Sequence, residues 1–367
     1  MATAITHTIG VLVRGHNALT ESLMGAERAM SQFRKTAEAT AQSINRLTPK
    51  DVDMSAIREA SDRLKGMGKT AMLAGTAVGA GLGLATQKAA SFQTAMAEVS
   101  TLVDTSQVDM AALGQTAKAL SAEFGVAPTE TVKSLYTTLS AGFTDSADGA
   151  TLLRGALKLA KAGLADTGVT IDGLTSVMNS YGMKAGEVTR VSDQMFIAVM
   201  AGKTTVNELA ASLGKVTPLA SSVGIGLDQV LAAVATLTLG GMNTAESVTA
   251  MRSALANVIK PSADATETAK KLGIHFDTAS IKSMGFAAWL AHVKEKTGGS
   301  SEALSKLFGD VQGLAGIMAL TGPQMSQLNS ILGQIVNSSG ATETAFKKVQ
   351  ATAGEAFNRA KANVSLV

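Results

Sequence analysis

Hydrophobic residues near the start of the chain recur in alternating steps of four and three positions, with Thr40 the only polar residue in the series. An α-helix turns once every 3.6 residues, so this spacing keeps a narrow apolar stripe on one helix face. The stripe predicts a helix of about 45 Å, at 1.5 Å per residue, that packs against another helix of this chain or of a second copy. Its apolar members, here called the heptad seam, are Leu19, Leu23, Ala26, Met30, Phe33, Ala37, Ile44 and Leu47.

An uncharged segment of 18 residues follows at positions 70–87, between Lys69 and Lys88. Its length just reaches that needed to cross a bilayer, and its GxxxG pair permits close helix approach. Because Ala, Gly and Thr contribute little transfer free energy, the composition favours a buried or conditionally inserting helix over a stable membrane anchor. The candidate membrane-active residues are Leu73, Gly75, Val78, Gly79, Leu82 and Leu84.

The rest of the chain shows short helical patterns separated by glycine turns, and long alternating β patterns are absent. Thr205 with Glu208 forms a capping box, Asn243 with Glu246 is a weaker start signal, and Pro128 suits a first helical position. We therefore predict an all-α fold. Its expected parts are a short strand and heptad coiled-coil region at 1–69, a Gly/Ala-rich helix at 70–90, a helical core at 91–320 and a C-terminal helical coil at 321–367.

The helical core contains an internal repeat with a spacing of about 99 residues. The matching segments are 124–126 with 223–225, 141–143 with 240–242 and, after one deletion, 153–157 with 251–255. Each copy has the order helix, glycine turn, polar start signal, helix. Duplication of a helical hairpin explains the repeat, and chance similarity between Ala-rich helices is the alternative.

A second 3–4 pattern runs from Phe346 to the last residue, Val367. A coil pattern that reaches the last residue indicates that this sequence is part of something longer.

Composition and motifs argue against chemistry in these residues. The net charge is +3, and before residue 70 ten basic and seven acidic residues are interspersed, as on a solvated helix surface rather than a phosphate-binding stripe. The chain has no Cys, which excludes disulfides and thiol catalysis. Its four His are isolated, which makes a zinc site improbable. The segment ending at Gly68-Lys69-Thr70 has Arg63 where a phosphate-binding loop needs Gly.

An enzymatic function is one alternative to a structural role, because Glu246-Ser247 is similar to the Glu-Ser of lytic transglycosylases. The downstream Gly-Leu-Met-Gln element of that class is missing, and helix capping explains Glu246. We therefore predict no catalytic, cofactor-binding or metal-binding residues.

The segment from Ser91 to about Ile274 resembles the core domain of tailed-phage tape measure proteins. The residues that carry the resemblance are 91–99, 124–130, 141–143, 216–220, 240–242 and 251–261. The short strand, coil and Gly/Ala helix ahead of them resemble that family's N-terminal layout. The length differs, because chains of this family are usually much longer. The resemblance therefore implies the front part of a longer chain, with a short member of the family as the alternative.

The resemblance implies a virion structural protein that is made in the host cytoplasm and occupies the lumen of the tail tube in several copies. There it would set tail length and assist genome passage at ejection. The implied partners are other copies of itself, tail tube and tail tip proteins, tail assembly chaperones and the host membrane, without sequence-specific nucleic acid or a cofactor. The alternative is a membrane-active translocation or pore-forming helical protein that uses residues 70–87.

Overall fold

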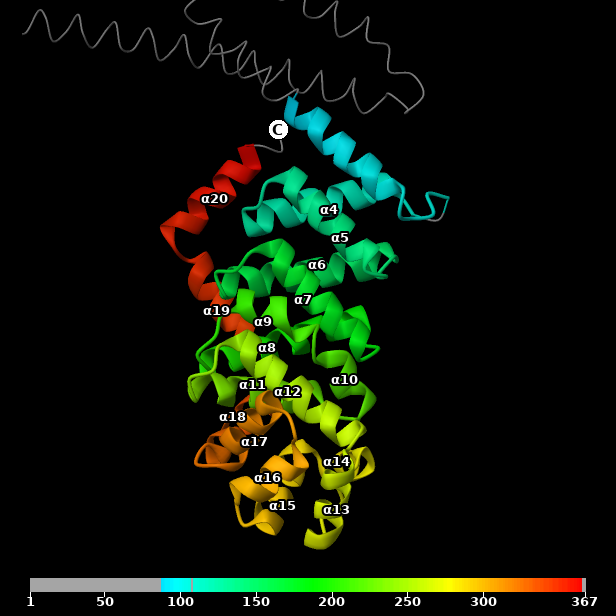
Figure 1. Ribbon diagram of the computed structural model, residues 1–367. Coiled ribbons are helices and arrows are strands. Elements are labelled where there is room, and N and C mark those ends of the chain that lie inside the picture. Colours follow the sequence, from blue (N-terminus) through cyan, green and yellow to red (C-terminus); the bar gives the residue numbers. More distant parts are fainter. Residues whose placement is uncertain (1–86, 107, 365–367) are drawn as a thin grey trace, which may run out of the picture. The chain divides into compact units, whose positions relative to one another are not determined.

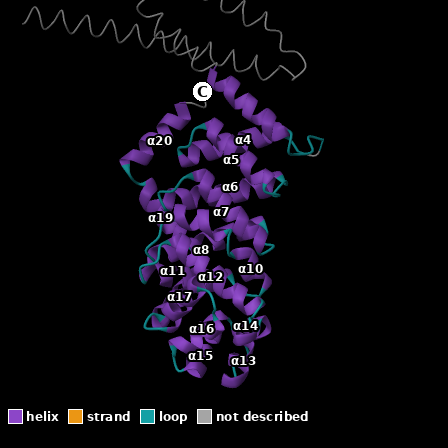
Figure 2. Ribbon diagram, in the orientation of Figure 1, coloured by secondary structure: helices purple, strands orange, loops and turns teal. Residues whose placement is uncertain are grey.

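Helices make up all the regular structure in the described part of the chain, residues 87–106 and 108–364 of this computed structural model (Figure 1). Figure 2 shows no strand there, so the all-α prediction is confirmed for these residues. A helix at 87–100 comes first. It is followed by α4 (Met110–Phe124), α5 (Pro128–Ser140), α6 (Ser146–Ala162), α7 (Thr167–Ser180), η1 (Ala185–Glu187), α8 (Val188–Ala201), α9 (Val206–Leu213), α10 (Thr217–Ser222), α11 (Leu227–Leu239), α12 (Thr244–Ile259), α13 (Ala263–Leu272), α14 (Thr278–Met284), α15 (Phe286–Thr297), α16 (Ser301–Leu307), α17 (Val311–Thr321), α18 (Met325–Val336), α19 (Ala341–Gln350) and α20 (Ala353–Val364).

Local capping sets where these helices begin. Thr205 and Glu208 form the expected capping box at α9, and Asn243 and Glu246 form a second one at α12. Pro128 is the first residue of α5, where its missing N–H costs no hydrogen bond. The three start signals expected from the sequence are therefore confirmed.

The described residues from Ala90 onward form one compact unit in which helices stack as two rows. The first row is α4, α6, α8, α11 and α18, and the second is α5, α7, α9, α12 and α17. Each helix packs on the next in its own row and on its partner across the rows, which produces five two-helix layers. The central helix α11 packs against α8, α10, α12, α17 and α18, and this explains why residues 230–238 are all buried.

Helices α13 to α16 leave the stack after α12 and return to it through α17 (Figure 1). Their core is aromatic. Trp289 is fully buried, with ring centroids of Phe276 at 5.7 Å, Phe286 at 6.2 Å and Phe308 at 6.4 Å. The Trp289 indole N–H donates to the His275 carbonyl at 3.1 Å, so its one polar atom is satisfied.

The repeated segments adopt matching local structure. Helices α5 and α11 have 13 residues each and begin 99 positions apart, at Pro128 and Leu227. The turns that follow them hold Gly142 and Gly241, both at φ 102°, a conformation that is costly for residues with a Cβ. These equivalences support our proposal that the core arose by duplication of a helical hairpin.

Gly173 permits the close approach of α7 and α9. A Cβ at this position would lie 2.5 Å from the Cβ and 2.6 Å from the Cα of Ala210. We expect Gly173→Ala to lower the free energy of unfolding by about 1–3 kcal/mol, because backbone has to move. Gly333→Ala in α18 is the matched control. No atom lies within 4 Å of its Cβ position, so it should raise stability by about 0.5–1 kcal/mol through helix propensity. Urea denaturation followed by circular dichroism measures both, and changes of the same sign would contradict this packing.

The segment predicted as a C-terminal coil is helical, but it is not continuous. It contains α18, α19 and α20, separated by a turn at 337–340, where Gly340 has φ 80°, and by another at 351–352. Helix α19 packs on α6 and α8, and α20 packs on α4. Of the residues in the 3–4 pattern, Phe346 is buried against Phe124, whereas Ala353, Ala356 and Ala360 are exposed, so the pattern does not mark one continuous covered face. We call α19 and α20 the C-terminal strap.

Candidate functional site at the C-terminal strap

A buried carboxylate anchors the beginning of the strap. Asp193, in the middle of α8, is almost inaccessible to solvent. Its Oδ2 accepts the Gly340 amide N–H at 2.7 Å, and its Oδ1 accepts the Thr342 amide N–H at 2.8 Å. The first amides of a helix have no partner within the helix and carry its positive dipole end. Asp193 satisfies two of these groups and so fixes the start of α19 on the third layer of the stack.

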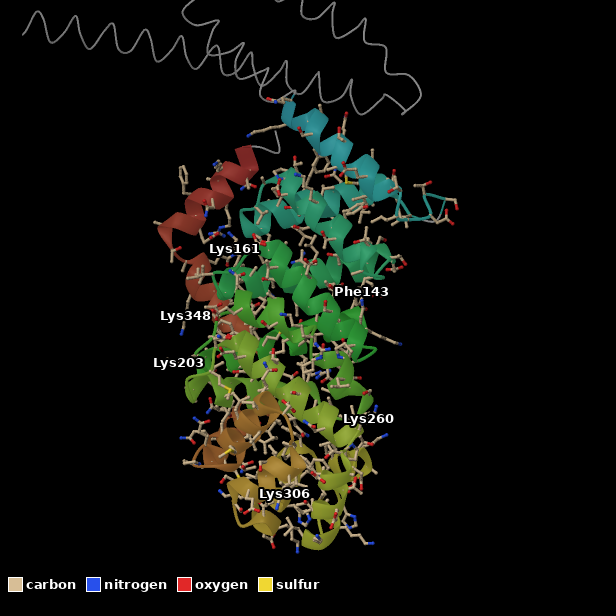
Figure 3. All side chains as sticks on the ribbon, viewed as in Figure 1. Phe143, Lys161, Lys203, Lys260, Lys306 and Lys348 are labelled. Atoms are coloured by element: carbon tan, nitrogen blue, oxygen red, sulfur yellow. The ribbon has the colours of Figure 1, made fainter. Side chains whose placement is uncertain are left out.

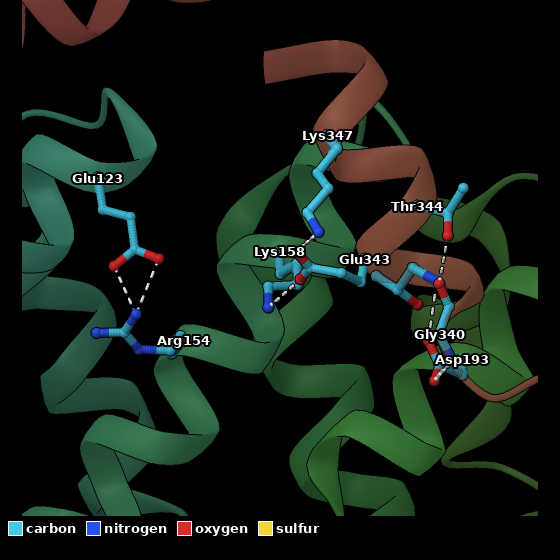
Figure 4. Close-up of polar contacts among 9 residues, drawn as sticks. Glu123, Arg154, Lys158, Asp193, Gly340, Glu343, Thr344 and Lys347 are labelled. Atoms are coloured by element: carbon cyan, nitrogen blue, oxygen red, sulfur yellow. Dashed lines mark hydrogen bonds and ion pairs between the residues drawn. The ribbon is translucent and has the colours of Figure 1, made fainter. Parts of the chain in front are cut away.

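Ion pairs hold the strap along the second layer. Lys158 and Lys161 of α6 contact Glu343 of α19 at 2.6 Å and Glu355 of α20 at 2.9 Å, respectively. Lys161 and Glu355 are both mostly shielded from solvent, which reduces screening of their interaction. Arg154, one turn earlier on α6, contacts Glu123 of α4 at 2.6 Å. Figure 4 shows the pairs made by Arg154 and Lys158 beside the Asp193 anchor.

Close apolar and backbone contacts hold the strap on the first layer. The Phe346 ring lies 5.2 Å from the Phe124 ring, centroid to centroid. Gly125, at φ 63°, lies so close to α20 that a Cβ there would be 2.9 Å from the backbone nitrogen of Arg359. The strap thus contacts α8, α6 and α4 in turn.

These contacts change the mechanics of the stack. In a layered helical array each layer touches only its neighbours, so stability is a sum of local terms. The strap adds direct links between residues that are 147 and 194 positions apart. In Figure 1, α20 ends at the same end of the unit as the helix at 90–100 begins. The arrangement can therefore clamp three layers together at the end where the unit starts.

The hydrogen bond from Lys158, reinforced by the charges of Lys158 and Lys347, holds the pKa of Glu343 below its ordinary value of about 4.3. Because the pKa of Glu343 is lower in the folded than in the unfolded chain, the ion pair stabilises the fold at pH values above the unfolded-state pKa of Glu343. This stabilisation is lost as the pH falls through the folded-state pKa. We expect Lys158→Met to reduce the difference in urea midpoint between about pH 7 and pH 3. Lys133→Met, which removes an exposed pair with Glu130, should leave that difference unchanged. Equal differences in the parent and in Lys158→Met would contradict the strap pairing.

The other site residues predicted from the sequence lie partly outside the described part of the chain. The heptad seam (Leu19 to Leu47) and the candidate membrane-active residues (Leu73 to Leu84) lie outside the described residues. Within the described part, no group of three or more His, Cys, Asp or Glu side chains could hold a metal ion. No helix there is long and apolar enough to cross a membrane. Glu246 serves as a capping residue.

Sequence reasoning missed the strap anchors. Asp193 offered one signal, because it lies between the apolar residues Val191 and Met195 of α8, although Ser192 and Gln194 beside it are buried as well. A carboxylate in such a position requires hydrogen-bond partners. Lys158, Lys161 and their glutamates carry no local signal, since charged residues on helices are usually solvated.

Comparison with known proteins places the chain in a family. Residues 114–309, more than half of the chain, match the family described as phage-related minor tail protein. The chain belongs to this family. The chain is 27% identical over 352 residues to the "Probable tape measure protein" of Clostridium phage phiCD119, an alignment covering 92% of this chain and 37% of the relative. It is 24% identical over 293 residues to the "Tape measure protein" of Pneumococcus phage Dp-1, covering 78% and 25%, respectively.

The resemblance to tape measure proteins is thereby confirmed. The chain spans 37% and 25% of the lengths of these two relatives. No solved structure matches the chain.

Proposed function

We propose that this chain is part of a tape measure protein that lies in the lumen of a phage tail tube, sets tail length and assists genome passage at ejection. The observation that carries the proposal is the alignment over 92% of the chain with a relative named as a probable tape measure protein. The chain acts structurally and without catalysis. The polar groups at its strap are engaged as a helix cap and as ion pairs.

The stack and the heptad seam contribute to length very differently. Five packed layers, at 8–10 Å between helix axes, measure roughly 40–50 Å. The 133 residues of these ten helices in one straight helix would span about 200 Å. The stack therefore contributes little length per residue, whereas a seam helix contributes about 1.5 Å for every residue. We assign length measurement to helices with a heptad pattern like that of the seam. The stack would instead be a rigid block that contacts tail tip proteins, tail tube proteins and tail assembly chaperones.

Protease protection tests the proposed location. In intact virions the chain should resist an added protease, because the tail tube shields its lumen. After ejection is triggered in vitro, the chain should be cleaved or lost from the particle. The major tail tube protein, probed in the same samples, controls for particle integrity. Cleavage of the chain in virions whose tubes are intact would place it outside the lumen and contradict the proposal.

A further inference from the structure

Leu164 is an outlier in both conformation and exposure. Among the described residues it is the one non-glycine residue with positive φ, at 51°. Its side chain is 83% exposed. The left-handed conformation is unfavourable for a residue with a Cβ, and strain of this kind points to a functional role when nothing else explains it.

Packing explains why the residue before Leu164 is glycine. In the turn between α6 and α7, a Cβ on the preceding residue, Gly163, would lie 2.2 Å from Cγ2 of Val206. Glycine is thus required at 163 for close approach, and the left-handed position falls on Leu164. The turn is closed by the Ala165 amide N–H, which donates to the Ala160 carbonyl at 2.8 Å. The fold accounts for the strain, but it gives no reason for a large apolar side chain in solvent.

Further exposed apolar side chains follow at the same edge of the stack. Each lies near a turn that joins the two rows: Met200 is 68% exposed, and Leu239 and Met318 are 42% and 41% exposed. Together with Leu164 they form what we call the apolar edge.

Contacts between successive turns connect these positions. The backbone at Gly163 lies close to the side chain of Val206, the first residue of α9. In the turn after α8, the Lys203 amide N–H donates to Thr238 Oγ1 of α11 at 3.0 Å. The backbone at Gly240 lies close to the side chain of Gln324, which directly precedes α18. In Figure 3, Lys203 lies at this edge, as does Lys161, which pairs with Glu355 of the strap, and Phe143 lies at the opposite edge.

We propose that the apolar edge docks the heptad seam of a second copy of this chain. Packed helices lie 8–10 Å apart, so the edge presents one apolar side chain about every 8–10 Å. A heptad advances about 10.5 Å along a helix, and the seam is a single narrow stripe. Its length of about 45 Å covers all four positions. The inference deepens and rests on the proposed function, because it states how copies in one tail contact each other.

Leu164→Gly separates a docking role from a folding role, because it removes the apolar side chain and the backbone strain together. We expect the melting temperature of the full chain to rise by about 2 °C. Self-association, measured by light scattering with dilution, should weaken about tenfold. Leu164→Met keeps an apolar side chain and should retain association. Unchanged association in Leu164→Gly would overturn the proposal, whatever the melting temperature does.

Cysteine cross-linking identifies the occupant, since the natural chain has no Cys. Full-length Leu164→Cys is mixed with full-length Met30→Cys under mild oxidation, and a disulfide-linked heterodimer is expected. Thr144→Cys, at an exposed turn of the opposite edge, should give little heterodimer with Met30→Cys. Equal yields for the two edges would overturn the proposal, as would a predominance of Leu164→Cys homodimers. Both experiments use purified protein, whereas the protease-protection test uses virions. A negative result here would therefore reject the docking proposal without rejecting the proposed function.

Discussion

Replacement of Trp289 by Ala is expected to lower the free energy of unfolding by about 3–5 kcal/mol, the range for a large buried aromatic. The side chain is fully buried among Phe276, Phe286 and Phe308. Its loss leaves a cavity and also removes the hydrogen bond to the His275 carbonyl. Urea denaturation followed by circular dichroism measures the change, since the variant lacks the chain's only Trp.

Tyr136→Ala is the matched control for Trp289→Ala. Tyr136 is an aromatic residue of α5 that is exposed, so its truncation should cost less than about 1 kcal/mol. A loss below about 1 kcal/mol for Trp289→Ala would show that α13 to α16 do not form the tight aromatic core described above.

Asp193→Ala is expected to cost about 2–4 kcal/mol and to release the strap. The substitution leaves the amides of Gly340 and Thr342, at the start of α19, without acceptors, at about 1–3 kcal/mol for a buried unsatisfied group and less for the partly buried Gly340 amide. Asp193→Asn is the conservative control. Its single amide oxygen can accept one of the two N–H groups, so its cost should be intermediate.

Carbodiimide coupling reports on the strap itself. In the parent protein it should join Lys161 to Glu355, whose charged atoms lie 2.9 Å apart, and mass spectrometry detects the linked peptide. The yield should fall strongly in Asp193→Ala and less in Asp193→Asn. A full yield in Asp193→Ala, at unchanged stability, would mean that Asp193 does not anchor the strap.

Local features of this chain were predictable, because their physics is local. The helix starts at Pro128, Thr205 and Asn243 follow from capping chemistry within three residues. The paired glycines Gly142 and Gly241 were visible as a repeat before their shared conformation was known. The all-α class follows from the same information.

Long-range pairing was not predictable from one sequence. The 3–4 pattern after Phe346 shows that one helix face is apolar, but the pattern does not show which surface covers it. In the structure the strap packs on α4, α6 and α8, and its anchors are brought together only by the stacking of layers. The turn at Gly163 and Leu164 was not predictable for the same reason. The side chain that requires glycine at 163 belongs to Val206, which lies in another layer of the stack.

The strap also determines where a test of length measurement can be made. A deletion in α19 or α20 would remove contacts to α4, α6 and α8 and would disturb the stack. Residues 23–36, two whole heptads of the seam, lie outside the strap. Their removal brings Leu19 and Ala37 four positions apart and so preserves the alternating pattern.

Electron microscopy of tails from phage that carry this deletion tests the central claim most directly. Loss of 14 residues from a straight helix should shorten the tail by roughly 21 Å, at 1.5 Å per residue. The matched control inserts the same number of residues at the exposed turn 298–300, between α15 and α16, where tail length should stay constant. The account predicts a shorter tail only for the seam deletion. An unchanged tail length in that variant, or a tail lengthened by the core insertion, would contradict it.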